Sequence, residues 1–282
     1  EHIVLYGMVD VSKMWADFDD EEFTPILVGG KAVVNIWMNN FLDTDCGGAY
    51  LETWHNTFVT KKDNPVTLPY DSPFSCIIQH ERAQSFLMRV ICSDAPGNPG
   101  AATKAVTAGR EVFGFPKHPT LGRIMHSYEE TDGKRVGWLF DALHCGKRVV
   151  QVRCQLPEED PNHVSVPVDV VLPPDYVVSS PRNGGTHKGH NGAHQQFFSQ
   201  AIGATQNVSV WNPETDSIAI GDDPHYGAPL SSWDFSPVLK VHIPNFKTAA
   251  FKPSGWISGG KAAEAVKEHE RRHAAGVALG AL

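Results

Sequence analysis

The stretch GREVFGFPKHP, residues 109–119, places one lysine, Lys117, directly behind two phenylalanines and a proline. An amine attacks a ketone only when it is unprotonated, and a free lysine has a pKa of about 10.4. Bringing this pKa to neutrality requires about 5–6 kcal/mol of destabilised charge, and burial among aromatic side chains supplies part of it. The alternative is a loop lysine whose stem packs on the aromatics.

Two further residues of this stretch bear on the charge of the lysine. Arg110 and His118 are possible cations, and a nearby cation lowers the pKa of an amine further. Pro116 restricts the backbone just before Lys117, which helps to hold an attacking atom in place. On this interpretation the amine of Lys117 is held uncharged in an apolar interior.

The composition excludes several classes of partner. The 282-residue chain carries a net charge of -8 and no dense cluster of Lys and Arg, so we expect no nucleic-acid partner. No run of 18 apolar residues occurs, so we expect no membrane span. The five cysteines are scattered without CxxC spacing, which is typical of reduced thiols in a cytoplasmic protein.

Short apolar runs separated by glycine and proline predict a β-rich fold. Two helices are expected, at 101–111 and 260–275, and residues 175–204 are the least regular part of the chain. A hairpin turn is expected at 144–147. Strands are expected at 32–38, 85–92, 136–140, 148–156, 164–172, 208–211, 217–220 and 238–243. The fold class is therefore α+β, mainly antiparallel β, in a single domain.

The motif around Lys117 resembles the signature of the acetoacetate decarboxylase family. Gly109-Arg110-Glu111, three residues, and then Pro116-Lys117 follow a short predicted helix, as in that family. The resemblance implies that Lys117 forms a Schiff base with a keto acid. It also implies a closed β-cone with flanking helices, a homo-oligomer, and no cofactor or metal.

The resemblance extends to other segments. Residues 33–60 resemble the strand, glycine loop and strand whose Tyr-x-Glu carries a pocket glutamate, and Tyr50-Leu51-Glu52 matches it. Residues 136–156 and 208–243 resemble the following hairpin and the closing strands. The domain then spans 1–282, with its core at about 25–255 and a C-terminal helical extension at 256–282.

Three positions depart from the family pattern. His118 stands where the decarboxylases have a second lysine, and Asn35 stands where another glutamate is usual. The pocket arginine of the family has no match in residues 1–24. A histidine is mostly neutral at pH 7, so desolvation must contribute more to activating Lys117. We expect His118 to act as an electrostatic or proton-transfer partner.

The remaining site predictions concern acid–base chemistry and the pocket wall. Glu52 is expected to serve as an acid, a base or a substrate-orienting group, and the alternative is a strand glutamate that faces solvent. Core packing and, for Arg110, an ion pair with Glu111 are the structural alternatives for the candidate substrate-binding residues. These candidates are Phe115, Trp54, Met88, Asn35 and Arg110.

Several functions remain open at this point. Decarboxylation of a β-keto acid through an enamine is the outcome that the resemblance implies. An aldolase, dehydratase or cyclase acting on a larger, more apolar oxo-compound shares the imine step. A third enzymatic route forms no imine and uses the pocket to shape a cyclisation or isomerisation. A β-cone that only binds a ligand is the non-enzymatic alternative. The spacing of His187, His190 and His194 permits a zinc site, but no carboxylate or cysteine lies nearby, so no metal is expected.

Overall fold

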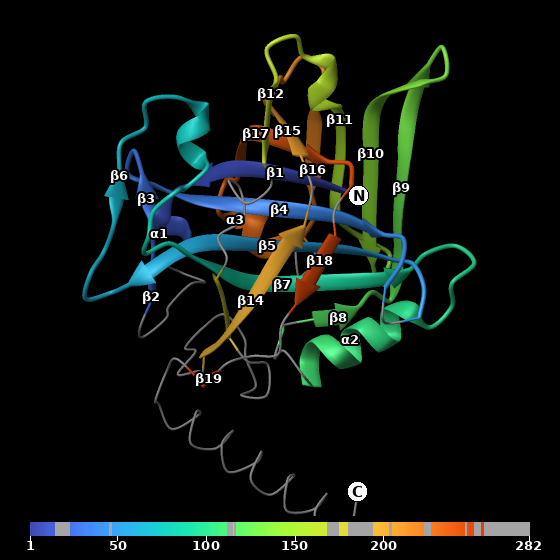
Figure 1. Cartoon of the computed structure of the whole chain (residues 1–282), viewed down its shortest axis with the longest axis horizontal. Helices are drawn as coiled ribbons and strands as arrows, with labels where there is room; N and C mark the ends of the chain where they lie inside the picture. The colour runs from blue at the N-terminus through green and yellow to red at the C-terminus, as the bar shows by residue number, and fades with distance from the viewer. Residues whose placement is uncertain are drawn as a thin grey trace, which may run out of the picture.

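The computed structural model of the chain describes eleven stretches, most of them from the first two thirds of the sequence (Figure 1). They are 1–14, 23–44, 47–111, 115, 117–167, 175–179, 194–202, 205–222, 227–245, 247–250 and 255–256. The helix expected at 260–275, and with it almost all of the expected C-terminal extension, lies outside the described residues.

The main element is a 15-stranded, mostly antiparallel sheet. Its path runs β12-β15-β17-β1-β4-β5-β7-β13-β14-β18, and β2, β3, β6, β8 and β19 pair beside it. The strands are β1 (His2–Val9), β2 (Phe23–Pro25), β3 (Leu27–Val28), β4 (Lys31–Phe41), β5 (Tyr50–Lys61), β6 (Thr67–Leu68), β7 (Gln84–Asp94), β8 (Lys117–Pro119), β12 (Val164–Pro167), β13 (Asp175–Ser179), β14 (His194–Ile202), β15 (Thr205–Val210), β17 (Ser236–Ile243), β18 (Lys247–Ala250) and β19 (Gly255–Trp256).

A second sheet of four strands has the order β16-β11-β10-β9. Its strands are β9 (Gly122–Thr131), β10 (Lys134–His144), β11 (Lys147–Gln155) and β16 (Ser217–Ile220). In Figure 1, β9 and β10 run steeply across the direction of β1, β4, β5 and β7. The β10–β11 turn has positive φ at both Cys145 and Gly146, the backbone of a type I′ hairpin turn.

The helices are few and short. They are α1 (Val11–Met14), α2 (Ala101–Glu111) and α3 (Gly227–Ser232), with 3-10 turns η1 (Pro73–Cys76) and η2 (Pro157–Glu159). No helix in the described part of the chain is both long enough and apolar enough to cross a membrane.

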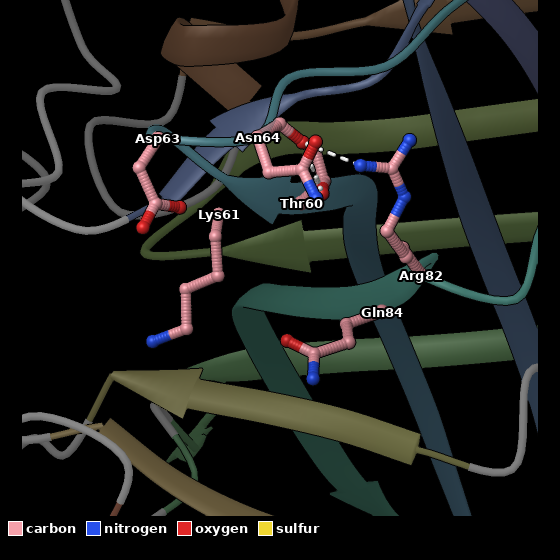
Figure 2. Close-up of a pocket in the computed structure, with 6 residues that line it drawn as sticks. All are labelled: Thr60, Lys61, Asp63, Asn64, Arg82 and Gln84. Atoms are coloured by element: carbon pink, nitrogen blue, oxygen red, sulfur yellow. Dashed lines mark hydrogen bonds between the residues drawn. The ribbon is translucent and has the colours of Figure 1, made fainter.

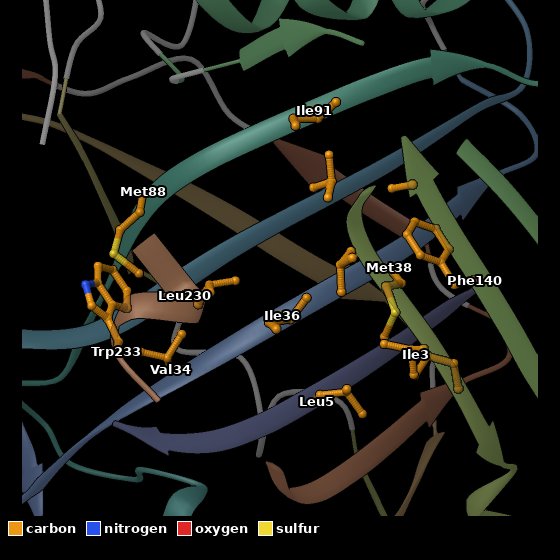
Figure 3. Close-up of a cluster of buried hydrophobic side chains, with 14 of the residues drawn as sticks. Ile3, Leu5, Val34, Ile36, Met38, Met88, Ile91, Phe140, Leu230 and Trp233 are labelled. Carbon is orange, nitrogen blue, oxygen red and sulfur yellow. The ribbon is translucent and has the colours of Figure 1, made fainter. Parts of the chain in front are cut away.

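Apolar side chains form one cluster on each face of the central strands. On one face, residues such as Ile36 and Phe140 join the main sheet to the second sheet (Figure 3). On the other face, Val4, Trp37 and Tyr50 belong to a cluster that α2 covers through Ala101 and its neighbours. We call this second cluster the α2-side cluster. Because both faces of the central strands are covered, β1, β4 and β5 are buried along nearly their whole length.

Most of the expected elements are confirmed. The helix at 101–111 has the predicted bounds, and the expected strands and the 144–147 turn lie within or overlap observed elements. Two expectations are not confirmed as stated. Residues 175–204 contain β13 and β14, which pair with each other and so are not simply irregular. The closed cone is not confirmed, since no pairing among the described residues joins β12 to β18.

Candidate active site

Helix α2 is fixed to the end of β7 by one carboxylate. Asp94 accepts hydrogen bonds from the backbone N–H groups of Gly100, at 2.8 Å, and Ala102, at 2.7 Å. These N–H groups have no partner within the helix, and a side-chain acceptor satisfies them. The start of α2, and hence the segment that leads to Lys117, is thereby held at the edge of the sheet.

The chain then turns back from α2 into β8. The N–H of Phe115 donates to the carbonyl of Gly109 at 2.9 Å, and the N–H of Lys117 donates to the carbonyl of Phe115 at 2.8 Å. Strand β8 pairs in parallel with β7, with Lys117 opposite Val90. Paired residues of neighbouring strands point to the same face of a sheet, and Val90 belongs to the α2-side cluster. Lys117 therefore also points toward this cluster.

Gly109 allows the helix to approach the lysine stem. A Cβ atom at position 109 would lie 2.7 Å from Cδ of Lys117 and 3.5 Å from a ring carbon of Phe115. Carbon atoms in contact are normally separated by about 3.5–4.0 Å, so only glycine fits here without displacing the lysine. Gly109, the first residue of the sequence motif, therefore leaves free the space that the Lys117 side chain occupies.

Lys117, Glu52 and Cys92 meet in the buried centre of this face. The Nζ atom of Lys117 lies 2.5 Å from Oε2 of Glu52, and Sγ of Cys92 donates to the same oxygen at 3.0 Å. The residues are 5%, 4% and 1% exposed, respectively. Glu52 and Cys92 lie directly opposite each other on β5 and β7, so the sheet register brings them together.

The charge beside the amine is negative. Burial by itself lowers the pKa of Lys117, but the neighbouring Cys92, Glu52 and Tyr50 outweigh it, and the pKa lies well above its ordinary value. Burial and the charge of Glu52 also raise the pKa of the Cys92 thiol well above its ordinary value. The contact of 2.5 Å with Glu52 adds to the neighbours that raise the pKa of Lys117.

This direction is opposite to the lowered pKa that was expected from the sequence for Lys117. The raised pKa favours an ammonium group in contact with Glu52. The structure also places Glu52, and not His118, against the amine. Consecutive side chains on a strand point to opposite faces, so the half-buried His118 and the buried Lys117 leave β8 in opposite directions.

Aromatic side chains lie on the same face of the sheet as the pair. The Lys117 Nζ lies 5.1 Å from the centre of the Tyr50 ring, within the range of a cation–π contact. Trp54 stacks on Trp37 with ring centres 5.2 Å apart, and it lies opposite Val90, which in turn pairs with Lys117. Phe115 packs against the same cluster. Trp54 and Phe115 therefore share the face of Lys117.

The remaining candidate substrate-binding residues are Met88, Asn35 and Arg110. Met88 packs in the cluster on the opposite face, where Figure 3 shows it beside Trp233, so it does not share the face of Lys117. Asn35 is buried and accepts a hydrogen bond from the indole N–H of Trp37 at 3.1 Å. Arg110 belongs to the last turn of α2, and its side chain lies outside the described residues.

A separate polar pocket lies at the far end of β5, lined by Thr60, Lys61, Asp63, Asn64, Arg82 and Gln84 (Figure 2). Arg82 donates to the carbonyl of Asn64 across it, at 3.4 Å. Glu52 precedes Thr60 by eight residues, about 26 Å along a strand. This pocket is therefore distinct from the lysine–glutamate pair.

Sequence patterns gave no sign of Cys92. Its role in the site depends on the β5–β7 register, which sets it opposite Glu52. Among the described residues, no group of three or more His, Cys, Asp or Glu is placed to hold a metal ion. His187 and His190, and the side chain of His194, lie outside the described residues.

Solved structures show which fold this is. An acetoacetate decarboxylase from Legionella pneumophila superposes with a TM-score of 0.53 at 12% identity, over 91% of this chain and 85% of that one. The chain has the acetoacetate decarboxylase-like fold. An acetoacetate decarboxylase-like enzyme from Sphingomonas wittichii RW1 superposes with a TM-score of 0.52 at 12% identity, over 90% of this chain and 89% of that one.

A third structure with the acetoacetate decarboxylase-like fold is the enduracididine biosynthesis enzyme MppR, complexed with the condensation product of pyruvate and imidazole 4-carboxaldehyde. It has a TM-score of 0.53 at 13% identity, over 91% of this chain and 86% of that one. No protein-family model and no curated protein matches the sequence. The fold predicted from the motif is thus confirmed by structure, apart from closure of the cone.

Proposed function

We propose that this protein is a Schiff-base-forming lyase in which Lys117 attacks the ketone of a β-keto acid or related oxo-compound. The observation that carries the proposal is the buried contact of 2.5 Å between Lys117 Nζ and Glu52 Oε2. A lysine in an apolar interior with a proton acceptor at contact distance meets the two requirements for imine formation.

The first step is proton exchange within the pair. Lys117 must pass one proton to Glu52, which gives a neutral amine and a neutral carboxylic acid. A low-dielectric surrounding favours this exchange, since an ion pair there lacks the solvation that stabilises separate charges. Closure of the pocket over an apolar part of a substrate would shift the balance in the same direction.

The following steps account for all atoms. The amine adds to the carbonyl carbon and one of its protons moves to the carbonyl oxygen, which gives a carbinolamine. Glu52 then returns its proton to the hydroxyl, which leaves as water and gives the protonated imine. The protonated imine withdraws the electron pair of the C–C bond to the carboxylate, and carbon dioxide leaves with formation of a neutral enamine. Protonation of the enamine carbon and hydrolysis of the imine release the ketone product and regenerate Lys117.

An aldol condensation or dehydration is the second candidate. It shares the imine and the enamine, but the enamine attacks an aldehyde instead of taking up a proton. The MppR structure, which holds a condensation product of pyruvate and an aldehyde, supports this candidate. Aromatic residues around Lys117, including Tyr50 and Trp54, favour a substrate that is larger and more apolar than acetoacetate.

One experiment separates these possibilities. The protein is incubated with 3-oxo acids of increasing chain length, or with pyruvate plus aromatic aldehydes, and products are followed by NMR while carbon dioxide is measured. The Lys117→Ala variant is the test and Lys240→Met is the matched control, because Lys240 is also buried and paired, with Asp216 at 2.7 Å. Turnover that persists in folded Lys117→Ala protein would overturn the proposal, whereas loss in that variant alone supports it.

A further inference from the structure

Cys92 shares one carboxylate oxygen with Lys117. Its Sγ atom donates to Oε2 of Glu52 at 3.0 Å, and Lys117 Nζ lies 2.5 Å from the same atom. The thiol comes from β7, which lies between β5, with Glu52, and β8, with Lys117. Side chains from three adjacent strands therefore meet at Oε2 of Glu52.

The thiol is placed to fix the direction of the carboxylate. A carboxylate has about four acceptor positions and rotates about its terminal bond, so a single contact from a long lysine side chain leaves it several orientations. A second donor on a short, buried side chain removes this freedom, and hydrogen bonds are stronger in the low-dielectric interior. Cys92 is 1% exposed and stands on a central strand.

The surroundings of Cys92 favour the protonated thiol, which is the form that can donate a hydrogen bond. Burial and the charge of Glu52 both disfavour the thiolate. A buried cysteine can also serve only as a small apolar side chain, as Cys76 does in the same α2-side cluster, where burial raises the thiol pKa to about 12. The contact with Glu52 is what distinguishes Cys92 from this structural role.

On the basis of the proposed function, we propose that Cys92 is a positioning residue whose thiol holds the Glu52 carboxylate against Lys117 for proton exchange. Its effect on the reaction passes through Glu52. Removing the thiol then resembles a partial loss of Glu52, and a side chain that retains a donor restores the arrangement.

A double-mutant cycle tests this dependence. The rate at which borohydride traps the substrate imine is measured for Cys92→Ala and Cys92→Ser, each in the wild-type and the Glu52→Gln background. We expect Cys92→Ala to slow trapping at least about tenfold in the wild-type background and less than about twofold with Glu52→Gln. Cys92→Ser, which keeps a hydroxyl donor, is expected to stay within about threefold of wild type.

Cys76→Ala is the matched control, since it removes a buried thiol from the same cluster. If Cys92→Ala lowers the trapping rate equally in both backgrounds, or in neither, the inference about Cys92 is overturned and the proposed function is left intact. Failure of wild-type protein to form any adduct at Lys117 instead contradicts the proposed function itself.

If the wild-type protein forms no adduct at Lys117, a measurement without substrate still tests the positioning role of Cys92. The titration of Lys117 is followed by NMR of protein labelled with 15N at the lysine Nζ. Because a fixed Glu52 carboxylate raises the pKa of Lys117, we expect Cys92→Ala to move the titration to lower pH and Cys92→Ser to restore it. An unchanged titration in folded Cys92→Ala protein overturns the positioning role whatever the reaction is.

Discussion

Lys117 and Glu52 are in contact although their strands are not neighbours. Glu52 belongs to β5 and Lys117 to β8, and β7 lies between them and pairs with both. The 2.5 Å contact therefore spans β7 on the α2 side of the sheet. An arrangement that buries two charges is costly unless they are paired, so each residue makes the burial of the other possible.

The first prediction concerns Glu52→Gln. Loss of the negative charge lowers the pKa of Lys117, because burial then acts without an opposing carboxylate. The alkaline rise of borohydride trapping should therefore move to lower pH. Turnover should nevertheless fall by about 10²–10⁴-fold, since the proton acceptor is gone. A pH profile that is unchanged, or shifted to higher pH, contradicts this account of the pair.

The second prediction concerns Gly109→Ala. The new Cβ would lie 2.7 Å from Cδ of Lys117 and must displace the lysine stem. Alanine also favours the helix by about 1 kcal/mol, so we expect Tm to change by only a few degrees while the rate of imine trapping falls at least about tenfold. Thr107→Ala, at an exposed position of α2, is the control and should leave trapping unchanged. If Gly109→Ala traps the imine at the wild-type rate, the reaction tolerates displacement of the Lys117 stem and the prediction is wrong.

The third prediction concerns the start of α2. Asp94→Ala removes the acceptor of two backbone hydrogen bonds, which costs about 1–2 kcal/mol of the free energy of unfolding. For a chain of this size Tm should fall by about 2–4 °C, and Asp94→Asn should lose less because it keeps one oxygen. Asp160→Ala, which removes an exposed loop contact to Asn162, is the control for thermal unfolding. Equal Tm values for Asp94→Ala and wild type would contradict the capping role.

The fourth prediction concerns stability as a function of pH. His242 lies between Glu1, at 2.8 Å, and Glu158, at 2.6 Å. Burial lowers its pKa, but the hydrogen bonds and charges of the two carboxylates outweigh burial and raise it above its ordinary value. The stabilisation is thus fully present below a pH of about 6.5 and is lost as the pH rises through the raised pKa.

This pH dependence is measured as the Tm difference between wild type and His242→Gln. We expect a difference of about 2–4 °C at pH 6 that shrinks at pH 9. His163→Gln is the control, since the His163 ring contacts only a backbone oxygen among its described hydrogen bonds. If the Tm difference between wild type and His242→Gln instead grows with pH, the claim that protonated His242 stabilises the fold is contradicted.

The motif and local patterns were enough to predict the fold and to single out the segment around Lys117 as the candidate site. The 101–111 helix was predictable because alanine and a preceding glycine–proline break act locally. Strand β1 was missed because it is buried on both faces, and its nearly continuous apolar run lacks the alternation of a half-exposed strand. It nonetheless lies between β17 and β4 at the centre of the main sheet.

The electrostatics of the site could not be predicted from local sequence. Adjacent residues such as His118 are close in the chain but point to the other side of β8, whereas Glu52 lies 65 positions away and is in contact. Cys92 and Met88 are four positions apart on β7, yet the irregular register between His55 and Asn56 places them on opposite faces. Such a bulge shifts every later side chain by one face, and only pairing reveals it.

The most direct test is the identity of the residue that carries a reduced imine. Wild-type protein is incubated with a 3-oxo acid and borohydride, digested, and examined by mass spectrometry for Lys117 and Lys240, the two lysines that are buried in the described part of the chain. The account predicts one adduct per chain, on Lys117, and none on Lys240 or in Lys117→Arg. An adduct on Lys240, or substrate turnover with Lys117 unmodified throughout, would contradict it.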